Sequence, residues 1–320
     1  MAGCVKRIYM LHRKALTLKQ LRALAAIVDS GSITAAAGVL HVTPPAVSTQ
    51  LRGLEDIVGA QVLLRGPSGK IALTPIGAEL LGTVRKIENS LDLCFQRVTA
   101  MRTGLAGYVS VGVVSTGKYF APGLVARMKR SHPEIEIGLK VGNREDTIER
   151  LARGEIELAI MGRPPVAPDS EYDELGDHPY VVIAPPEHPL AGAKMVAPAD
   201  LLRETFLCRE EGSGSRILMI RYLDQIGEGR PYRIVEMGTN ETIKQAVMAG
   251  LGVAIISAHT IVPELEAGRL VTLALEGMPI HRTWYLIRLT ETEMSPVAAV
   301  FRKFLLELEG DYLPALPEAP

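Results

Sequence analysis

The sequence predicts an α/β protein with three parts: a helix-dominated winged helix-turn-helix head, a long linker helix and a two-lobed α/β domain. Short helical patterns separated by tight turns open the chain, and two short strand patterns follow them. A long helical pattern comes next, and from residue 107 strands and helices alternate. The predicted boundaries are 1–74 for the head, 75–106 for the linker helix and 107–320 for the α/β domain.

Charge is distributed unevenly along the 320 residues, although the net charge is only −1. Residues 1–90 hold 11 Lys and Arg against 5 Asp and Glu, a net charge of +6, and the remainder holds 24 against 31, a net charge of −7. A basic head favours nucleic-acid binding, although charge also fluctuates between domains without any function. Three cysteines, no apolar run long enough for a bilayer and no signal-peptide pattern predict a cytoplasmic protein without membrane contact.

Each of the three helical patterns in the head begins at a residue that favours a helix N-terminus. Thr17 precedes the first helix, and Ser32 precedes the second. Thr43 precedes the third, with Pro44 at the first helical position, where its missing N–H costs nothing. Two short helices joined by a tight turn predict a helix-turn-helix.

The third helix has the pattern of a helix that lies in the major groove of DNA. Its apolar side chains share one face, which we expect in the core: Val47, Leu51, Leu54 and Val58. The opposite face carries Pro45, Ser48, Thr49 and Arg52. Short hydrogen-bonding side chains allow a close approach to base edges, whereas an ordinary surface helix carries more Lys and Glu. We therefore predict DNA recognition by this face.

A wing and a linker helix follow the helix-turn-helix. Two strands in 62–73 enclose a turn rich in Gly and Pro, and Arg65 and Lys70 flank it within reach of phosphates or the minor groove. The helix predicted over 75–102 carries an apolar seam at 4-3 spacing: Leu80, Val84, Ile87, Leu91, Cys94, Val98 and Met101. This seam predicts a coiled-coil dimer, and packing on the chain's own body is the alternative. The predicted DNA contacts are Ser32, Thr43, Pro44, Pro45, Ser48, Thr49, Arg52, Arg65 and Lys70.

The alternation after residue 107 predicts two α/β lobes, the first with a parallel β-α-β-α-β unit. Strands are predicted at 108–114, 135–141, 158–161, 180–184, 206–208, 232–236, 253–256, 270–275 and 283–287. Helices are predicted near 120–131 and 145–153, from Ser215, from Asn240 and over 296–309. The late strands and the last helix return to the first lobe, which is typical of a hinged binding module.

Ligands of open α/β sheets bind beyond the carboxyl ends of the strands, and polar residues gather there in this sequence. Three junctions, 114–118, 209–216 and 238–241, place hydroxyls and cations at helix starts, and Arg144 and Arg163 each follow a strand. A capped helix explains any one junction alone, but together they predict a cleft for an anion. The predicted contacts are Ser115, Thr116, Lys118, Asn143, Arg144, Arg163, Ser213, Ser215, Arg216, Thr239 and Asn240.

Enzyme chemistry has little support in the sequence. The loop at 212–215 lacks the Gly-Lys-Ser/Thr ending of a P-loop, and the seven histidines include no HExxH motif. We therefore predict no catalytic activity, no metal and no permanently bound cofactor.

Several motifs resemble those of the LysR-type transcriptional regulators: Leu18-Lys19-Gln20-Leu21, Ala35-Ala36-Ala37, the run 40–48, and Leu73-Thr74-Pro75-Ile76-Gly77. Segments 142–144, 161–165 and 240–247 are similar to the CbbR subgroup, which controls carbon-fixation (RuBisCO) operons. Pro44 and Thr49 depart from the common family pattern, so the operator preference is expected to differ. The resemblance implies lobes like those of periplasmic solute-binding proteins, with crossovers near 162–165 and 267. Lobe I is then 107–162 with 268–310, and lobe II is 163–267.

The resemblance also implies a function. The expected protein is a dimeric or tetrameric regulator that binds an inverted-repeat operator in double-stranded DNA and activates carbon-fixation genes, with RNA polymerase as a further partner. Its effector would be an anionic metabolite between the lobes: a phosphorylated metabolite, phosphoenolpyruvate or NADPH. Two alternatives remain, namely a LysR-type regulator of another operon with a carboxylate effector, or a small-molecule-binding α/β protein without a DNA function.

Overall fold

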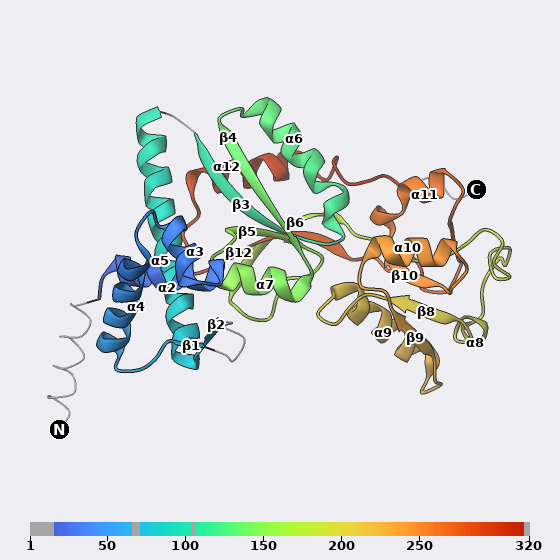
Figure 1. Ribbon diagram of the computed structural model, residues 1–320. Helices are drawn as coiled ribbons and strands as arrows, with labels where there is room; N and C mark the ends of the chain where they lie inside the picture. Colours follow the sequence, from blue (N-terminus) through green and yellow to red (C-terminus); the bar gives the residue numbers. More distant parts are fainter. Residues whose placement is uncertain (1–15, 66–70, 104–105, 317–320) are drawn as a thin grey trace, which may run out of the picture. The chain divides into compact units, whose positions relative to one another are not determined.

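The computed structural model describes residues 16–65, 71–103 and 106–316, and the chain forms two compact units, Met1–Cys94 and Phe95–Pro320 (Figure 1). The elements of the head and linker are α2 (Leu18–Ser30), α3 (Ile33–Val39), α4 (Pro44–Val58), β1 (Leu63–Arg65), β2 (Ile71–Leu73) and α5 (Pro75–Thr103). All six were predicted from the sequence, and the long helix was predicted to end at residue 102, within one residue of the end of α5. In the described part of the chain, no helix is long and apolar enough to cross a membrane.

The caps of the first two helices are as predicted, and the third is not. Thr17 forms a capping box with Gln20, and Ser32 accepts a hydrogen bond from the Ala35 N–H. Thr43 occupies the N-cap position of α4, but its side chain makes no capping hydrogen bond. The prolines at the first two helical positions fix φ and need no N–H partner, so α4 begins without that bond.

The first half of α5 belongs to the core of the head, contrary to the simple seam prediction. Val84 is fully buried with Leu24 and Leu54, and Leu80 and Ile87 pack at the edge of this cluster. Two ion pairs fasten the same stretch to α2: Arg22 with Glu88, at 2.7 Å, and Arg85 with Asp29, at 3.1 Å. In the second half of the predicted seam Cys94 and Val98 are exposed, and the dimer along it stays a prediction. The side chain of Met101 lies outside the described part.

Lobe I is a five-stranded mixed sheet in the order β4-β3-β5-β12-β6. Its strands are β3 (Gly107–Val114), β4 (Ile135–Gly142), β5 (Leu158–Met161), β6 (Ser170–Asp177) and β12 (Thr283–Leu289). The first three are parallel, as predicted, and β12 and β6 run antiparallel to their neighbours. Helices α6 (Ala121–Ser131) and α12 (Pro296–Glu307) cover one face, and α7 (Arg144–Ala152) covers the other (Figure 1).

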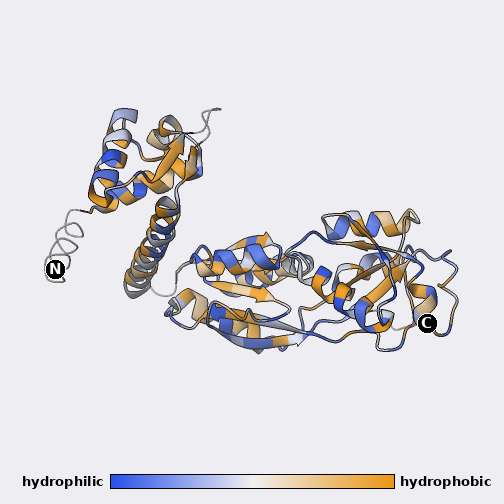
Figure 2. Cartoon of the chain, turned by 90° about the horizontal axis from the view of Figure 1, so that it is seen from below, coloured by the Kyte–Doolittle hydropathy of each residue, from blue (hydrophilic) through white to orange (hydrophobic). Residues whose placement is uncertain are grey.

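The strands of lobe II form a three-stranded sheet and a two-stranded sheet. They are β7 (Tyr180–Ala184), β8 (Thr205–Cys208), β9 (Arg233–Glu236), β10 (Ala254–Ser257) and β11 (Val271–Thr272), and the helices are α8 (Pro198–Leu201), α9 (Gly214–Gly227), α10 (Asn240–Met248) and α11 (Val262–Glu266). Alternate residues of β7 face opposite cores: Val182 packs toward α9, and Val181 and Ile183 pack toward α10. Figure 2 shows the apolar strands inside and the hydrophilic outer faces of the helices.

The crossovers between the lobes do not lie where they were predicted. Strand β6 pairs with β12 in lobe I, so the chain first crosses at residues 178–179 and not at 162–165. Strand β11 pairs with β7 in lobe II, so the return falls between β11 and β12 and not at 267. The pattern missed β6 because this edge strand is largely polar and buries only Leu175.

Candidate functional site

The exposed face of α4 matches the predicted recognition surface, Pro45, Ser48, Thr49 and Arg52. Pro45, Thr49 and Arg52 are exposed, and Ser48 is half-buried. Among the described residues Arg52 has no ion-pair partner, so its guanidinium is available to an anion. Thr49 is more restricted, because its hydroxyl donates to the Pro45 carbonyl at 2.9 Å and can only accept a further hydrogen bond.

The remaining predicted DNA contacts differ in what they can offer. Thr43 keeps a hydroxyl that its own helix does not use, whereas the Ser32 hydroxyl already caps α3. Pro44 and Pro45 have no N–H, so the first turn of α4 offers a phosphate fewer donors than an ordinary helix N-terminus. Lys70 and the side chain of Arg65 lie outside the described residues.

A cleft of about 890 Å³ lies between the two lobes, at the carboxyl ends of β3, β4, β5 and β8. Seven of the eleven predicted contacts line it: Ser115, Thr116, Asn143, Arg144, Arg163, Ser213 and Ser215. They come from four separate segments of the chain, after β3, β4, β5 and β8, and the sheet topology brings them together. The expectation that polar junctions gather at the strand ends is met for these seven residues.

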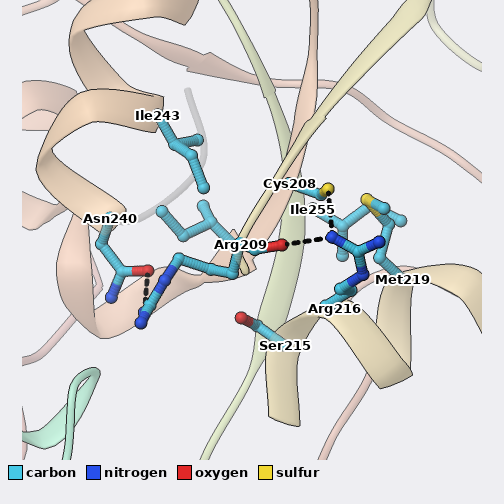
Figure 3. Close-up of a pocket in the computed structure, with 9 residues that line it drawn as sticks. Cys208, Arg209, Ser215, Arg216, Met219, Asn240, Ile243 and Ile255 are labelled. Atoms are coloured by element: carbon cyan, nitrogen blue, oxygen red, sulfur yellow. Dashed lines mark hydrogen bonds between the residues drawn. The ribbon is translucent and has the colours of Figure 1, made fainter. Parts of the chain in front are cut away.

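The other four predicted contacts lie outside this cleft. The chain after Thr116 forms a 3-10 turn, Gly117–Tyr119, and Lys118 in it lies 3.8 Å from the Glu241 carboxylate. Thr239 caps α10, and Arg216 pairs with Glu236 at 2.6 Å. Asn240 lies behind the cleft and accepts a hydrogen bond from Arg209. Figure 3 shows the two arginines diverging, Arg209 toward Asn240 and Arg216 toward Cys208.

The cleft wall is strongly cationic. Five arginines line it: Arg144, Arg163, Arg209, Arg221 and Arg282. None of the described residues that line it is an Asp or a Glu. Burial lowers the pKa of Arg144, and the neighbouring Arg163 guanidinium lowers it further. Two cations that repel each other in a partly buried site favour an anion between them.

Arg209 is the most constrained of these arginines and connects the two lobes. It is buried, and its guanidinium donates to Ser115 of lobe I at 3.1 Å and to the Gly238 carbonyl at 2.9 Å. It also forms a forked pair with Glu210. Burial acts to raise the pKa of Glu210, but hydrogen bonds from Arg209 and Asn143 outweigh it and hold this pKa below its usual value.

The predicted contacts do not include three of the five arginines. Arg209 directly follows β8 and begins the junction 209–216, which the sequence marks as polar, but only Ser213, Ser215 and Arg216 of that junction were predicted as contacts. Arg221 lies within α9, and Arg282 lies in the return crossover, where no local pattern marks them. His178 of the first crossover and His281 of the second also line the cleft unpredicted.

Comparison with known proteins agrees with this architecture. The sequence profile of the "LysR substrate binding domain" matches residues 102–309, and that of the "Bacterial regulatory helix-turn-helix protein, lysR family" matches residues 18–78. The chain belongs to the LysR family. It is therefore a DNA-binding transcriptional regulator and not an enzyme, and the predicted fold class is confirmed.

Similar proteins also confirm the resemblance to the CbbR subgroup. The "HTH-type transcriptional regulator CbbR" of Cereibacter sphaeroides is 48% identical over 96% of this chain and 100% of its own length. A "RuBisCO operon transcriptional regulator" of Allochromatium vinosum is 41% identical over 91% of this chain and 95% of its own. The solved regulatory domain of Synechocystis CcmR "in complex with 2-PG" is 35% identical, with a TM-score of 0.59, and covers 63% of this chain and 97% of its own.

Proposed function

We propose that this LysR-family regulator controls a carbon-fixation (RuBisCO) operon in response to a phosphorylated anionic metabolite bound between the lobes. The observation that carries the proposal is the cleft wall, which holds five arginines and, among the described residues, no carboxylate. The relatives named for CbbR and for the RuBisCO operon support the target genes, and the CcmR complex with 2-PG supports a small-molecule effector of this domain.

The effector contacts of this proposal are the seven predicted residues that line the cleft, together with the arginines that prediction missed. Thr116 offers a hydroxyl and Arg163 a forked donor. The other groups already make hydrogen bonds that an anion would have to share or replace: Ser115 donates to the Gly142 carbonyl, Ser213 and Ser215 bond to each other, and Arg144 donates to the Arg163 and Pro164 carbonyls. An effector that touches both lobes binds their different arrangements unequally, which is the condition for shifting the population between them.

The head would read an inverted-repeat operator through the exposed face of α4 and through the wing. A dimer formed along the second half of α5, and a tetramer built from two dimers, would present paired heads to the two half-sites. The shift between lobe arrangements would change how these heads are spaced and so activate transcription by RNA polymerase, in the cytoplasm.

Footprinting on the promoter region of a RuBisCO operon tests the target. We expect protection of an inverted repeat, and no specific protection would contradict the proposal. A thermal-shift screen of 2-PG, phosphoenolpyruvate, NADPH and unphosphorylated dicarboxylates tests the ligand class. Stabilisation by dicarboxylates alone would support the alternative of a different operon with a carboxylate effector.

A further inference from the structure

His178 stands on the first crossover, between β6 and β7, and lines the cleft. Only 1% of its surface is exposed. Its ring stacks on the indole of Trp284 with the centroids 3.8 Å apart and the planes at 14°. Trp284 is the second residue of β12, directly after the return crossover, so one pair of stacked rings connects both crossovers.

The hydrogen bonds around the stack determine which nitrogen of His178 carries the proton. Its Nε2 lies 3.0 Å from the Oγ of Ser257, a fully buried hydroxyl whose only hydrogen-bond partner among the described residues is this imidazole. A buried hydroxyl needs an acceptor for its proton, so Ser257 donates to Nε2 and the ring proton lies on Nδ1. Burial, aided by the nearby His259, holds the pKa of His178 well below its usual value, so the ring is neutral.

The Nδ1–H of His178 is a buried donor without an acceptor among the described residues. It faces Gly162, another residue of the cleft wall, where a Cβ would stand only 2.8 Å from Nδ1. Gly162 belongs to lobe I and His178 to the crossover itself. A different angle between the lobes would move this nitrogen relative to the covering backbone, and in the present arrangement the donor is unsatisfied.

We propose that Nδ1 of His178 donates a hydrogen bond to an oxyanion of the effector when the lobes take up the arrangement that the effector selects. This inference rests on the proposed function and assigns to His178 a role that the arginines do not fill. The arginines attract charge from several directions, whereas a single neutral donor requires an oxygen atom at one position. The hydrogen bond exists in only one arrangement, so it supplies the unequal affinity through which a ligand shifts the crossovers.

Two substitutions distinguish the roles of the two ring nitrogens of His178. An Asn side chain places its amide near the position of Nδ1, and a Gln side chain reaches the position of Nε2. Both remove the stack on Trp284, so they form a matched pair. Titration calorimetry of the full chain with 2-PG and with phosphoenolpyruvate should show affinity near that of the wild type for His178→Asn, and a loss of roughly tenfold for His178→Gln.

The outcomes distinguish this inference from the proposed function. If the wild-type chain and both variants bind an anion equally, or if both folded variants lose affinity equally, His178 is not the donor, while the arginine cleft stands. If the wild-type chain binds neither anion, the proposed function fails and this inference fails with it. Unfolding followed by circular dichroism checks that both variants are folded.

Nitrogen-15 NMR of histidine-labelled protein gives an independent reading. We expect His178 to carry its proton on Nδ1 without ligand, and we expect the resonance of that proton to move when 2-PG is added. A proton on Nε2 would overturn the inference and leave the proposed function untouched.

Discussion

In the proposed function the exposed face of α4 and the cleft between the lobes both contact phosphate, but they place their charge in different ways. The α4 face carries a single arginine among Pro45, Ser48 and Thr49, while five arginines converge on the cleft. DNA is an extended polyanion, so a recognition helix needs a close fit to the groove and only a few of its own charges at any one point. A small anion has no such extent, so its charge must be met from several sides.

The net charges of the two parts of the chain are opposite to what these two surfaces would suggest. The basic first 90 residues present a nearly uncharged recognition face, and the acidic remainder encloses a cationic cleft. The net charge of each domain therefore indicates which domain can lie against DNA. The positions of the strand ends indicate where a small anion binds. Substitutions in the two regions should therefore affect anion binding and operator binding separately.

Replacing Arg209 should have the largest effect. Arg209→Met leaves Glu210 and Asn240 without their buried partner, which should lower the free energy of unfolding by about 3 kcal/mol and abolish anion binding. Urea unfolding and calorimetry with 2-PG check both effects. Arg216→Met is the matched control, because Arg216 lies outside the main cleft. Equal loss of anion binding in both variants would contradict the proposal that the arginines lining the cleft bind the anion.

Replacing Arg52 should impair DNA binding by α4 and leave the cleft between the lobes unchanged. Arg52→Ala should weaken operator binding by about 1–3 kcal/mol, because this side chain is the one cation among Pro45, Ser48, Thr49 and Arg52. Fluorescence anisotropy with operator DNA at two salt concentrations measures the loss, and anion affinity should stay at the wild-type value. Operator binding that is indifferent to Arg52 would refute the assignment of this face.

Acid should destabilise the effector domain through its buried histidines. Burial lowers the pKa of His259 from 6.5 to about 4, so the unfolded chain binds the extra proton between these values. The stability that neutral His259 contributes is complete above pH 6.5 and is lost as the pH falls toward 4. His259→Asn keeps an acceptor for the Trp284 indole and removes the titration, so its stability should depend less on pH. Fluorescence of Trp284, the only tryptophan, monitors this domain selectively.

Thr49→Ala should have the smallest effect. Its hydroxyl donates to the carbonyl of its own helix, so we expect a loss of operator affinity of less than about 0.5 kcal/mol in the same anisotropy assay. Thr43→Ala is the comparison, since the Thr43 hydroxyl is not used by α4 and should matter more. A Thr49 effect as large as that of Arg52 would show that the hydroxyl turns toward DNA.

The head could be predicted closely from the sequence because its signals are local. Thr17 and Ser32 cap the helices that they precede, and the apolar spacing of α4 places Val47 and Leu54 in the core. The same spacing could not say what the seam of α5 packs against. A periodic apolar face must pack against some apolar surface, and Val84 packs against Leu24 and Leu54 of the head of the same chain.

The cleft could be predicted only in part. Strand ends that alternate with helices marked Ser115, Arg144 and Arg163, but Arg221 and Arg282 reach the cleft through topology alone. The lobe boundaries failed for a related reason. Strand β6 is a polar edge strand, and pairing with a strand more than a hundred residues away, not its own composition, makes it part of lobe I.

Operator binding measured with and without 2-PG, in wild-type protein and in Arg163→Gln, tests whether an anion in the cleft controls DNA binding by the head. Arg203→Gln serves as the control, because Arg203 is an exposed residue of lobe II outside the cleft. The account predicts that 2-PG changes the footprint or the operator affinity of the wild type and of the control but not that of Arg163→Gln. A response to 2-PG that persists unchanged in Arg163→Gln, or that is absent from the wild type, would contradict it.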